Sequence, residues 1–391
     1  MFWVVLIGAA PGFLFGVAML WSVWRTVASL DALADTHIPD KDRWPVVSLI
    51  SPACNEEAHL EASLKSVLSN HYPRLEVVAI NDRSNDRTPQ IIDTLAETDD
   101  RLKPVHITHL PDGWLGKLNA MAQGVEAASG EWLLFCDADV IFAPNALQKA
   151  IAYAESKQLD YLAALAKIEP TDFWADTVFN VLMPIMFVGA RPWAVRNPES
   201  EAILGSGAFV LVRRSAYDAS PGLEWMRLEV ADDQTICALI KSHGGRCDVV
   251  NGCDDISLEW YHSLGEMVRM MQKNFFAIVA HFSLLRGLAT ALGTLYLGLF
   301  PLLVLVTGAG WASAVPALGL IAMIVATLWS SRWVARPWLP CLFPGIGLLL
   351  VAFMVTRASL IGWRAGGIFW RGVFYSSELL NAHQRYGRRR S

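Results

Sequence analysis

Two aspartates separated by one residue, Asp137 and Asp139, follow a strongly apolar stretch of the sequence. That stretch, residues 132–136, reads Trp-Leu-Leu-Phe-Cys and predicts a buried β-strand. Because alternate side chains of a strand point to the same side, we expect both carboxylates to face one crevice. Such a pair can hold a hard divalent cation that bridges a diphosphate. Taken alone, Asp-Ala-Asp is also typical of a turn after a buried strand.

The sequence around this pair alternates between strand and helix patterns. We expect strands at residues 46–51, 75–80, 103–106 and 132–136, and helices at residues 60–69, 88–97 and 117–128. This alternation predicts an α/β domain with a parallel sheet covered by helices, in which ligands bind beyond the carboxyl ends of the strands. Polar loops at residues 52–57 and 81–86 follow the first two strands. Three acidic loops are therefore expected at one edge of the sheet.

Long apolar stretches lie at both ends of the chain. Its 391 residues are 53% hydrophobic with a mean hydropathy of +0.34, too apolar for an ordinary soluble enzyme. Residues 2–24 carry no charge, and residues 288–355 carry only Arg332 and Arg336. We therefore expect an N-terminal transmembrane helix within residues 1–27, a catalytic domain in residues 44–280 and transmembrane helices in residues 286–357.

The C-terminal apolar block divides into residues 288–306, 311–329 and 339–355, each long enough to cross a bilayer. Three crossings would separate the basic tail from the catalytic domain, although basic flanks favour the cytoplasmic side. Pro344, Gly345 and Gly347 interrupt the third segment. We therefore expect the third segment to be re-entrant or a tight hairpin.

Residues 358–391 combine aromatic and basic side chains. Residues 362–375 predict an amphipathic helix in the membrane interface, with packing against the catalytic domain as the alternative. The basic tail would attract anionic lipid head groups, and we expect the catalytic domain on the cytoplasmic face of the membrane. The formal net charge of −5 argues against nucleic acid as a partner.

Several motifs together resemble those of the family 2 glycosyltransferases, which have the GT-A fold. The resembling segments are residues 51–57, 80–88, 116–120 with Gly124, 128–131, 137–139 and 231–233. Their order and spacing extend over about 220 residues, as in that family. The resemblance implies a doubly wound mixed sheet of the GT-A type, with transmembrane helices on both sides of it in the sequence.

The resemblance also implies roles for particular residues. The donor nucleotide would contact Pro52, Asn55, Glu56, Asp82, Lys117 and Asp137. Asp137 and Asp139 would bind a divalent metal, Mg²⁺ or Mn²⁺. Asp233 would be the catalytic base, with Asp232 as the alternative. The acceptor would lie beside Gly205, Gly207, Gln272 and Lys273.

Structural roles compete with some of these assignments. Asp82 could close an Asx turn, and Asp86 is expected to cap the helix that begins near Thr88. Asp232 and Asp233 could cap a helix instead of acting in catalysis. Lys117 at a helix start is unfavourable for the helix dipole unless a phosphate lies nearby, which favours a ligand role.

Residues 269–274, Arg-Met-Met-Gln-Lys-Asn, depart from the (Gln/Arg)-x-x-Arg-Trp motif of similar processive synthases and ceramide glucosyltransferases. The departure argues against processive polymerisation. Together with residues 113–117 and 370–372, this segment is more similar to the carotenoid- and hopanoid-associated bacterial glycosyltransferases.

The resemblance implies an inverting, metal-dependent enzyme. It would move one sugar from a nucleoside diphosphate donor, with a UDP-sugar favoured, to a hydroxyl of a membrane lipid of the hopanoid, carotenoid or glycolipid type. Transfer to a polyprenyl phosphate is one alternative. A catalytically inactive membrane scaffold that binds nucleotide sugar or lipid is the other, although it would not need a catalytic base.

Overall fold

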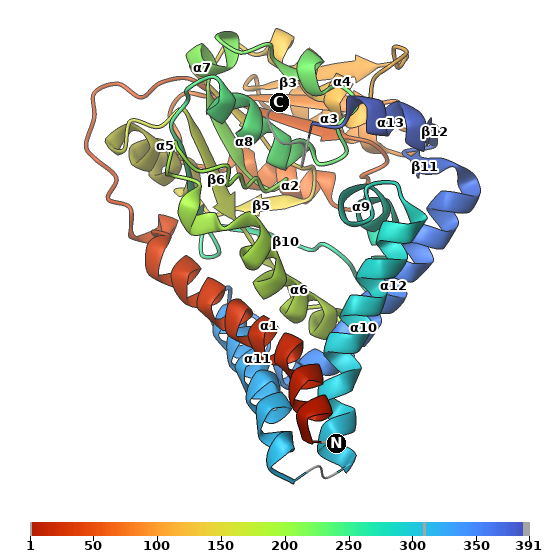
Figure 1. The fold of residues 1–391 in the computed structure, drawn as a ribbon. Helices are drawn as coiled ribbons and strands as arrows, with labels where there is room; N and C mark the ends of the chain where they lie inside the picture. Colours follow the sequence, from red (N-terminus) through yellow and green to blue (C-terminus); the bar gives the residue numbers. More distant parts are fainter. Residues whose placement is uncertain (1, 308–309, 386–391) are drawn as a thin grey trace. The chain divides into compact units, whose positions relative to one another are not determined.

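The computed structural model describes residues 2–307 and 310–385, which divide into two compact units (Figure 1). The α/β unit comprises residues 30–168 and 194–259 together with the end of the chain from His383. The helical unit comprises residues up to 29, residues 169–193 and residues 260–382.

A seven-stranded sheet forms the centre of the α/β unit, in the order β3-β2-β1-β4-β8-β6-β9. Its strands are β1 (Val47–Ala53), β2 (Leu75–Asp82), β3 (Leu102–Ile107), β4 (Trp132–Phe135), β6 (Tyr161–Leu165), β8 (Val210–Arg213) and β9 (Cys247–Asn251). Every residue of β1 and β2 is buried, as expected for parallel strands covered on both faces.

The sheet is mixed rather than wholly parallel. Strands β1 to β4 pair in parallel with one another, as the alternation predicted, but β8 pairs antiparallel with both β4 and β6. The parallel arrangement predicted for β1 to β4 is therefore confirmed, and the antiparallel β8 makes the sheet mixed, as the resemblance implied. A smaller sheet contains β5 (Val140–Phe142), β7 (Lys167–Ile168) and β10 (Ile256–Leu258).

Six α-helices of at least five residues accompany these sheets within the described part of the α/β unit. They are α2 (Leu60–Leu68), α3 (Thr88–Ala96), α4 (Gly116–Ala127), α5 (Ala146–Ser156), α7 (Arg214–Asp218) and α8 (Asp232–Ser242). Short 3-10 helices cover Leu33–Asp35 and Leu223–Met226. Helices α4 and α8 begin with charged residues, which become important at the functional site.

The helical unit contains α1 (Phe2–Ser29), α6 (Phe173–Ala190), α9 (Leu264–Asn274), α10 (Leu284–Thr307), α11 (Ala314–Trp333), α12 (Pro344–Ala365) and α13 (Ser377–His383). A π-helical turn covers Phe275–Val279, and 3-10 helices cover Pro192–Ala194, Gly310–Ser313 and Leu339–Leu342. Helix α1 packs along α11, and α10 packs along α12 (Figure 1).

Five helices among the described residues are long and apolar enough to cross a membrane. They cover Ile7–Ser29, Phe173–Ala194, Leu284–Thr307, Ala314–Trp333 and Pro344–Ala365. The sequence did not single out the second of these, since Asp176, Thr177 and Asn180 interrupt its hydrophobic residues. Length and composition are therefore compatible with a membrane protein.

Most of the third C-terminal apolar segment lies in one continuous helix, α12, so the tight hairpin, one of its two expected forms, was wrong. Pro344 occupies the start of α12, where a missing backbone N–H costs no hydrogen bond. Gly345 lies against the backbone of Gly298 on α10, and Gly347 lies against Thr177 on α6. These glycines allow close helix packing instead of breaking the helix.

The prediction of an amphipathic helix over residues 362–375 was also wrong. Helix α12 ends at Ala365, and Gly366 follows in the left-handed conformation. The next residues form a hairpin of β11 (Gly367–Trp370) and β12 (Val373–Ser376). Its two turn residues, Arg371 and Gly372, both have positive φ, at 48° and 79°. A two-residue turn of this kind matches the twist of a β-hairpin.

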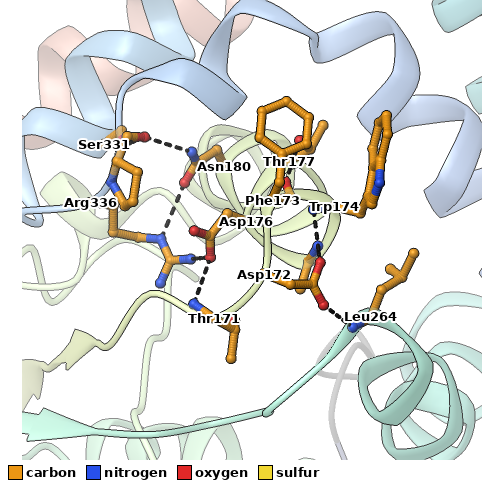
Figure 2. A network of polar contacts seen from close by, with 12 residues as sticks. Thr171, Asp172, Phe173, Trp174, Asp176, Thr177, Asn180, Leu264, Ser331 and Arg336 are labelled. Carbon is orange, nitrogen blue, oxygen red and sulfur yellow. Dashed lines mark hydrogen bonds and ion pairs between the residues drawn. The ribbon is translucent and has the colours of Figure 1, made fainter.

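A buried polar network holds α6 within the helical unit (Figure 2). Arg336 forms an ion pair with Asp176, and these side chains are only 2% and 5% exposed. Arg336 Nε also donates to Asn180 Oδ1 at 3.2 Å, and its guanidinium carbon lies 4.2 Å from the ring centroid of Phe179. The charge of Arg336 is therefore paired inside the unit.

A second carboxylate in this network, that of Asp172, joins two helix starts (Figure 2). Asp172 Oδ1 accepts hydrogen bonds from the amides of Trp174 and Ala175 at the start of α6. Its other oxygen accepts from the amide of Leu264, the first residue of α9, at 2.6 Å. One side chain thus caps the N-termini of both helices.

Candidate active site

A cleft in the α/β unit lies at the carboxyl ends of β1 and β4. It is lined by Pro52, Lys117, Met121, Phe135, Cys136, Asp137, Gly207, Val210, Asp232, Asp233 and Ile236. The apolar lining residues come from β1, α4, β8, α8 and the end of β4, and they support the charged groups. Of the acidic residues predicted for the site, Asp137, Asp232 and Asp233 line this cleft, whereas Glu56, Asp82 and Asp139 are not among the lining residues.

Lys117 connects two of the predicted acidic groups. Its Nζ lies 2.7 Å from Asp137 Oδ1 and 2.8 Å from Asp232 Oδ2. Burial by itself lowers the pKa of Lys117, but the two carboxylates outweigh burial and raise that pKa above its ordinary value. A lysine at the start of α4 is unfavourable for the helix dipole, and the two carboxylates offset this cost. The sequence had suggested that a phosphate would do so.

Asp139 has an unsatisfied oxygen. Its Oδ1 is buried and makes no hydrogen bond to any residue that the structure describes. Burial, followed by the charges of Asp137 and Glu56, raises the pKa of Asp139 to about 7. A buried carboxylate oxygen without a donor is suited to bind a cation.

The carboxylates of Asp137 and Asp139 fit a divalent metal by ligand type, since both supply hard oxygen atoms. Within residues 2–307 and 310–385, no group of three or more His, Cys, Asp or Glu side chains is arranged to hold a metal ion. A metal at this pair would therefore need further oxygen ligands, which a diphosphate and water can supply.

Asp232 and Asp233 occupy the first turn of α8, and the N-cap position before them is Ala231. Asp233 Oδ1 accepts a hydrogen bond from the amide of Gln234 at 2.8 Å. Burial and then the charge of Asp232 raise the pKa of Asp233 to about 6. Asp233 therefore has a proton affinity suited to general base chemistry near neutral pH.

Two glycines allow the backbone to approach these acids closely. A Cβ atom at Gly207 would collide with Asp137 Oδ2, and a Cβ atom at Gly205 would collide with the backbone carbonyl of Asp233. The carbonyl of Gly207 also accepts a hydrogen bond from the amide of Asp137 at 2.9 Å. The two glycines predicted beside the acceptor thus contact the acidic residues directly.

Comparison with known proteins agrees with this arrangement. Residues 48–219 match the family described as Glycosyl transferase family 2. The chain carries a family 2 glycosyltransferase domain. Its fold is similar to that of the mannosyltransferase PcManGT from Pyrobaculum calidifontis in complex with GDP-Man and Mn²⁺, with a TM-score of 0.51 and 19% sequence identity over 92% of this chain and 99% of that one. The GT-A fold is confirmed.

Curated relatives resemble parts of this chain. The probable glycosyltransferase YdaM of Bacillus subtilis is 38% identical over 97 residues, which are 24% of this chain and 23% of YdaM. The beta-monoglucosyldiacylglycerol synthase of Nostoc sp. is 29% identical over 194 residues, which are 48% of this chain and 40% of that enzyme. The matches thus cover less than half of the length of either relative.

The loops after β1 and β2 of the glycosyltransferase domain are bound to each other. Asn55 Oδ1 accepts from the amide of Asn85 at 2.8 Å, and the amide of Glu56 donates to Thr88 Oγ1 at 2.9 Å. Asp86 Oδ1 accepts from the amide of Thr88, the first residue of α3, at 2.9 Å, although the N-cap position itself is Arg87. These bonds fix the loops that carry the predicted nucleotide contacts.

Asp82 is fully buried, and both of its oxygens accept hydrogen bonds from Arg83, at 2.7 and 3.2 Å. A Cβ atom at Gly116 would lie 2.6 Å from Asp82 Oδ2 and 2.6 Å from Arg83 Nη2. Sequence reasoning did not identify Arg83 as part of this site. The signal in the sequence is the run Asn-Asp-Arg-Ser after β2. Within this run Arg83 has a positive φ of 56°, which is an unusual backbone conformation for an arginine.

Two predicted acceptor residues belong to the helical unit. Gln272 Oε1 accepts a hydrogen bond from Arg357 Nη1 at 2.8 Å. Lys273 Nζ lies 3.8 Å from the ring centroid of Trp370. Both contacts join α9 to other elements of the same unit, and they give Gln272 and Lys273 structural partners there.

Proposed function

We propose that this protein is an inverting, metal-dependent glycosyltransferase that moves one sugar from a nucleoside diphosphate donor to a hydroxyl of a membrane lipid. The observation that carries this proposal is the cleft of a family 2 glycosyltransferase domain, in which Asp137, Asp232 and Asp233 converge around Lys117. A diphosphate needs cationic partners, and an acceptor hydroxyl needs a base.

Asp233 is assigned as the base. Its carboxylate would take the proton of the acceptor hydroxyl as that oxygen attacks the anomeric carbon, and direct attack inverts the configuration there. The raised pKa of Asp233, about 6, leaves the carboxylate mostly ionised at neutral pH while making it a stronger base than an ordinary aspartate. Asp232 is held by Lys117 and would serve to position that lysine.

The donor would lie between Lys117 and the loops after β1 and β2. Lys117 would contact the diphosphate, while Pro52, Asn55, Glu56 and Asp82 would surround the nucleoside. Asp137 and Asp139 would hold Mg²⁺ or Mn²⁺, which would neutralise the charge of the leaving diphosphate. We favour a UDP-sugar as donor.

A lipid acceptor is supported by the five apolar helices, because a lipid hydroxyl is available only at the head-group level of a bilayer. The name of the Nostoc relative, a beta-monoglucosyldiacylglycerol synthase, supports the same acceptor class. We place the α/β unit on the cytoplasmic face, beside the nucleotide sugars. Hopanoids, carotenoids and glycolipids are the acceptors to examine first.

The test is nucleoside diphosphate release by the full chain in lipid nanodiscs. A panel of UDP- and GDP-sugars should be tested with Mn²⁺ or EDTA, and with or without lipid extract as acceptor. Release that depends on both metal and a neutral lipid hydroxyl supports the proposal. Transfer to polyprenyl phosphate alone would replace the acceptor, and tight donor binding with no release by any acceptor would favour the scaffold alternative.

A further inference from the structure

The end of the chain folds onto the segment that leads into α8. The backbone amide of Arg385 donates a hydrogen bond to Glu229 Oε2 at 2.6 Å. Arg385 Nε donates to the carbonyl of Trp225 at 3.2 Å, and its guanidinium carbon lies 5.0 Å from the ring centroid of Trp225. Gln384 is buried, with 6% of its surface exposed. These contacts join residues about 160 positions apart in one unit.

Glu229 is the centre of this contact. Only 2% of Glu229 is exposed, so its carboxylate depends on protein donors in place of water. One oxygen accepts from Arg385, and the other accepts from the amide of Ala231 at 3.3 Å. Ala231 directly precedes Asp232. A single carboxylate therefore links the C-terminal end to the start of α8.

The same segment is also bonded to the start of α4. The carbonyl of Arg227 accepts a hydrogen bond from the amide of Leu115 at 2.8 Å. Leu115 directly precedes α4, whose Lys117 pairs with Asp232. Residues 225–231 thus connect to both helix starts that carry the charged groups of the cleft. A shift of this segment would change the separation of Lys117 from the two α8 aspartates.

We propose that residues 384–385 form a C-terminal strap that positions Asp232 and Asp233 through Glu229. Gln384 and Arg385 are positioning residues, since they act on residues 225–231 and not on the reacting atoms. The catalytic consequence rests on the proposed glycosyltransferase function. The strap itself is a structural claim that can be measured without turnover.

Two substitutions at one position separate the contacts of the strap. Arg385→Pro removes the amide that donates to Glu229, because proline has no N–H. Arg385→Ala keeps that amide and removes only the guanidinium contacts to Trp225. We expect kcat to fall by about 10- to 100-fold in Arg385→Pro, because a misplacement of about 1 Å can cost about 100-fold. The loss should be smaller in Arg385→Ala.

A third substitution tests the same bond from its acceptor. Glu229→Gln leaves one accepting oxygen, so the side chain can accept from the amide of Arg385 or from that of Ala231, but not from both. The matched control is Glu378→Ala, which changes an exposed residue of α13. Donor affinity should stay within about twofold of the original in all four variants, because the strap acts on the base and not on ground-state binding.

Hydrogen exchange followed by mass spectrometry gives the readout that does not require activity. Amides of residues 229–235 should exchange faster in Arg385→Pro than in the control. Unchanged exchange in this segment overturns the strap. Equal losses of donor affinity, kcat and thermal stability also overturn it, since they indicate a general folding role. If the unmodified protein transfers no sugar, the proposed function fails, and the exchange result still decides whether the strap exists.

Discussion

Both compact units bury charged side chains. The cleft of the α/β unit leaves part of its charge unbalanced, unlike the buried polar network of the helical unit. There, Arg336 is matched by one carboxylate, that of Asp176, and the remaining polar groups of Asn180 also have partners (Figure 2). Because each buried charge of this pair is met by the opposite charge and by hydrogen bonds, the pair does not require a ligand. Its role in the described structure is to attach α6 to the turn after α11.

The cleft of the α/β unit has an excess of negative charge. Asp137, Asp232 and Asp233 line it, Asp139 follows directly after its wall, and Lys117 is the cation among its lining residues. The raised pKa values of Asp139 and Asp233, about 7 and about 6, result from burial and from neighbouring carboxylates. From this comparison we infer that matched charges serve packing, whereas unmatched charges favour binding of a cation and a substrate, as the proposed function requires.

The sharpest test of this comparison is Asp233→Asn. Removal of a general base costs about 100- to 10,000-fold in rate, so kcat should fall by that factor. Donor affinity, measured by calorimetry with Mn²⁺ present, should remain unchanged. Asp232→Asn should lose less, because Asp232 is bound to Lys117. The opposite ranking of the two variants would make Asp232 the base.

The helical unit should respond to charge removal in stability. Arg336→Met leaves Asp176 buried without its cation, which should cost about 3–5 kcal/mol of stability. Adding Asp176→Leu should recover most of that loss, because a buried pair can often be replaced by apolar side chains. Thermal unfolding in detergent measures both changes, with the exposed Arg332→Met as control. A double variant no more stable than Arg336→Met would show that the network is more than a matched pair.

The pH dependence of kcat is the mildest test. Since the raised pKa of Asp233 is about 6, its base form is lost as the pH falls through 6. At saturating donor and metal, kcat should then fall by about tenfold for each further pH unit. In Asp232→Asn the fall of kcat at acid pH should begin at a lower pH, because the charge of Asp232 contributes to the raised pKa of Asp233. If kcat falls over the same pH range in Asp232→Asn and in the unmodified protein, the titrating group is not Asp233.

The sequence was sufficient to locate the acidic loops. Strand periodicity and apolar runs placed Asp82 and Asp137 at strand ends, and the parallel pairing of β1, β2 and β4 brings those ends to one edge. The sequence was not sufficient to predict the direction of β8. This strand follows a glycine-rich segment, and its direction depends on its pairing with both neighbouring strands. Nor could the sequence predict that Lys117 pairs with Asp232, because that contact joins separate helices.

In the helical unit, the errors arose from treating local composition as decisive. Helix α6 was missed because Asp176 and Asn180 lower its hydrophobicity, while the structure gives both residues buried partners. The hairpin was mistaken for a helix because its aromatic and basic residues also fit an amphipathic pattern. Arg371-Gly372, at the centre of that pattern, was the overlooked turn signal.

Gly205 and Gly207 provide a criterion for sorting related genes. Either glycine leaves space that any other residue would fill, at the carbonyl of Asp233 or at the carboxylate of Asp137. A homologous sequence that retains every aspartate but has alanine at one of these positions cannot build the same cleft unless the Asp233 backbone or the Asp137 carboxylate shifts. A search of related genes by their aspartates alone would therefore include sequences that cannot form this cleft. Requiring glycine at both positions as well would remove those sequences.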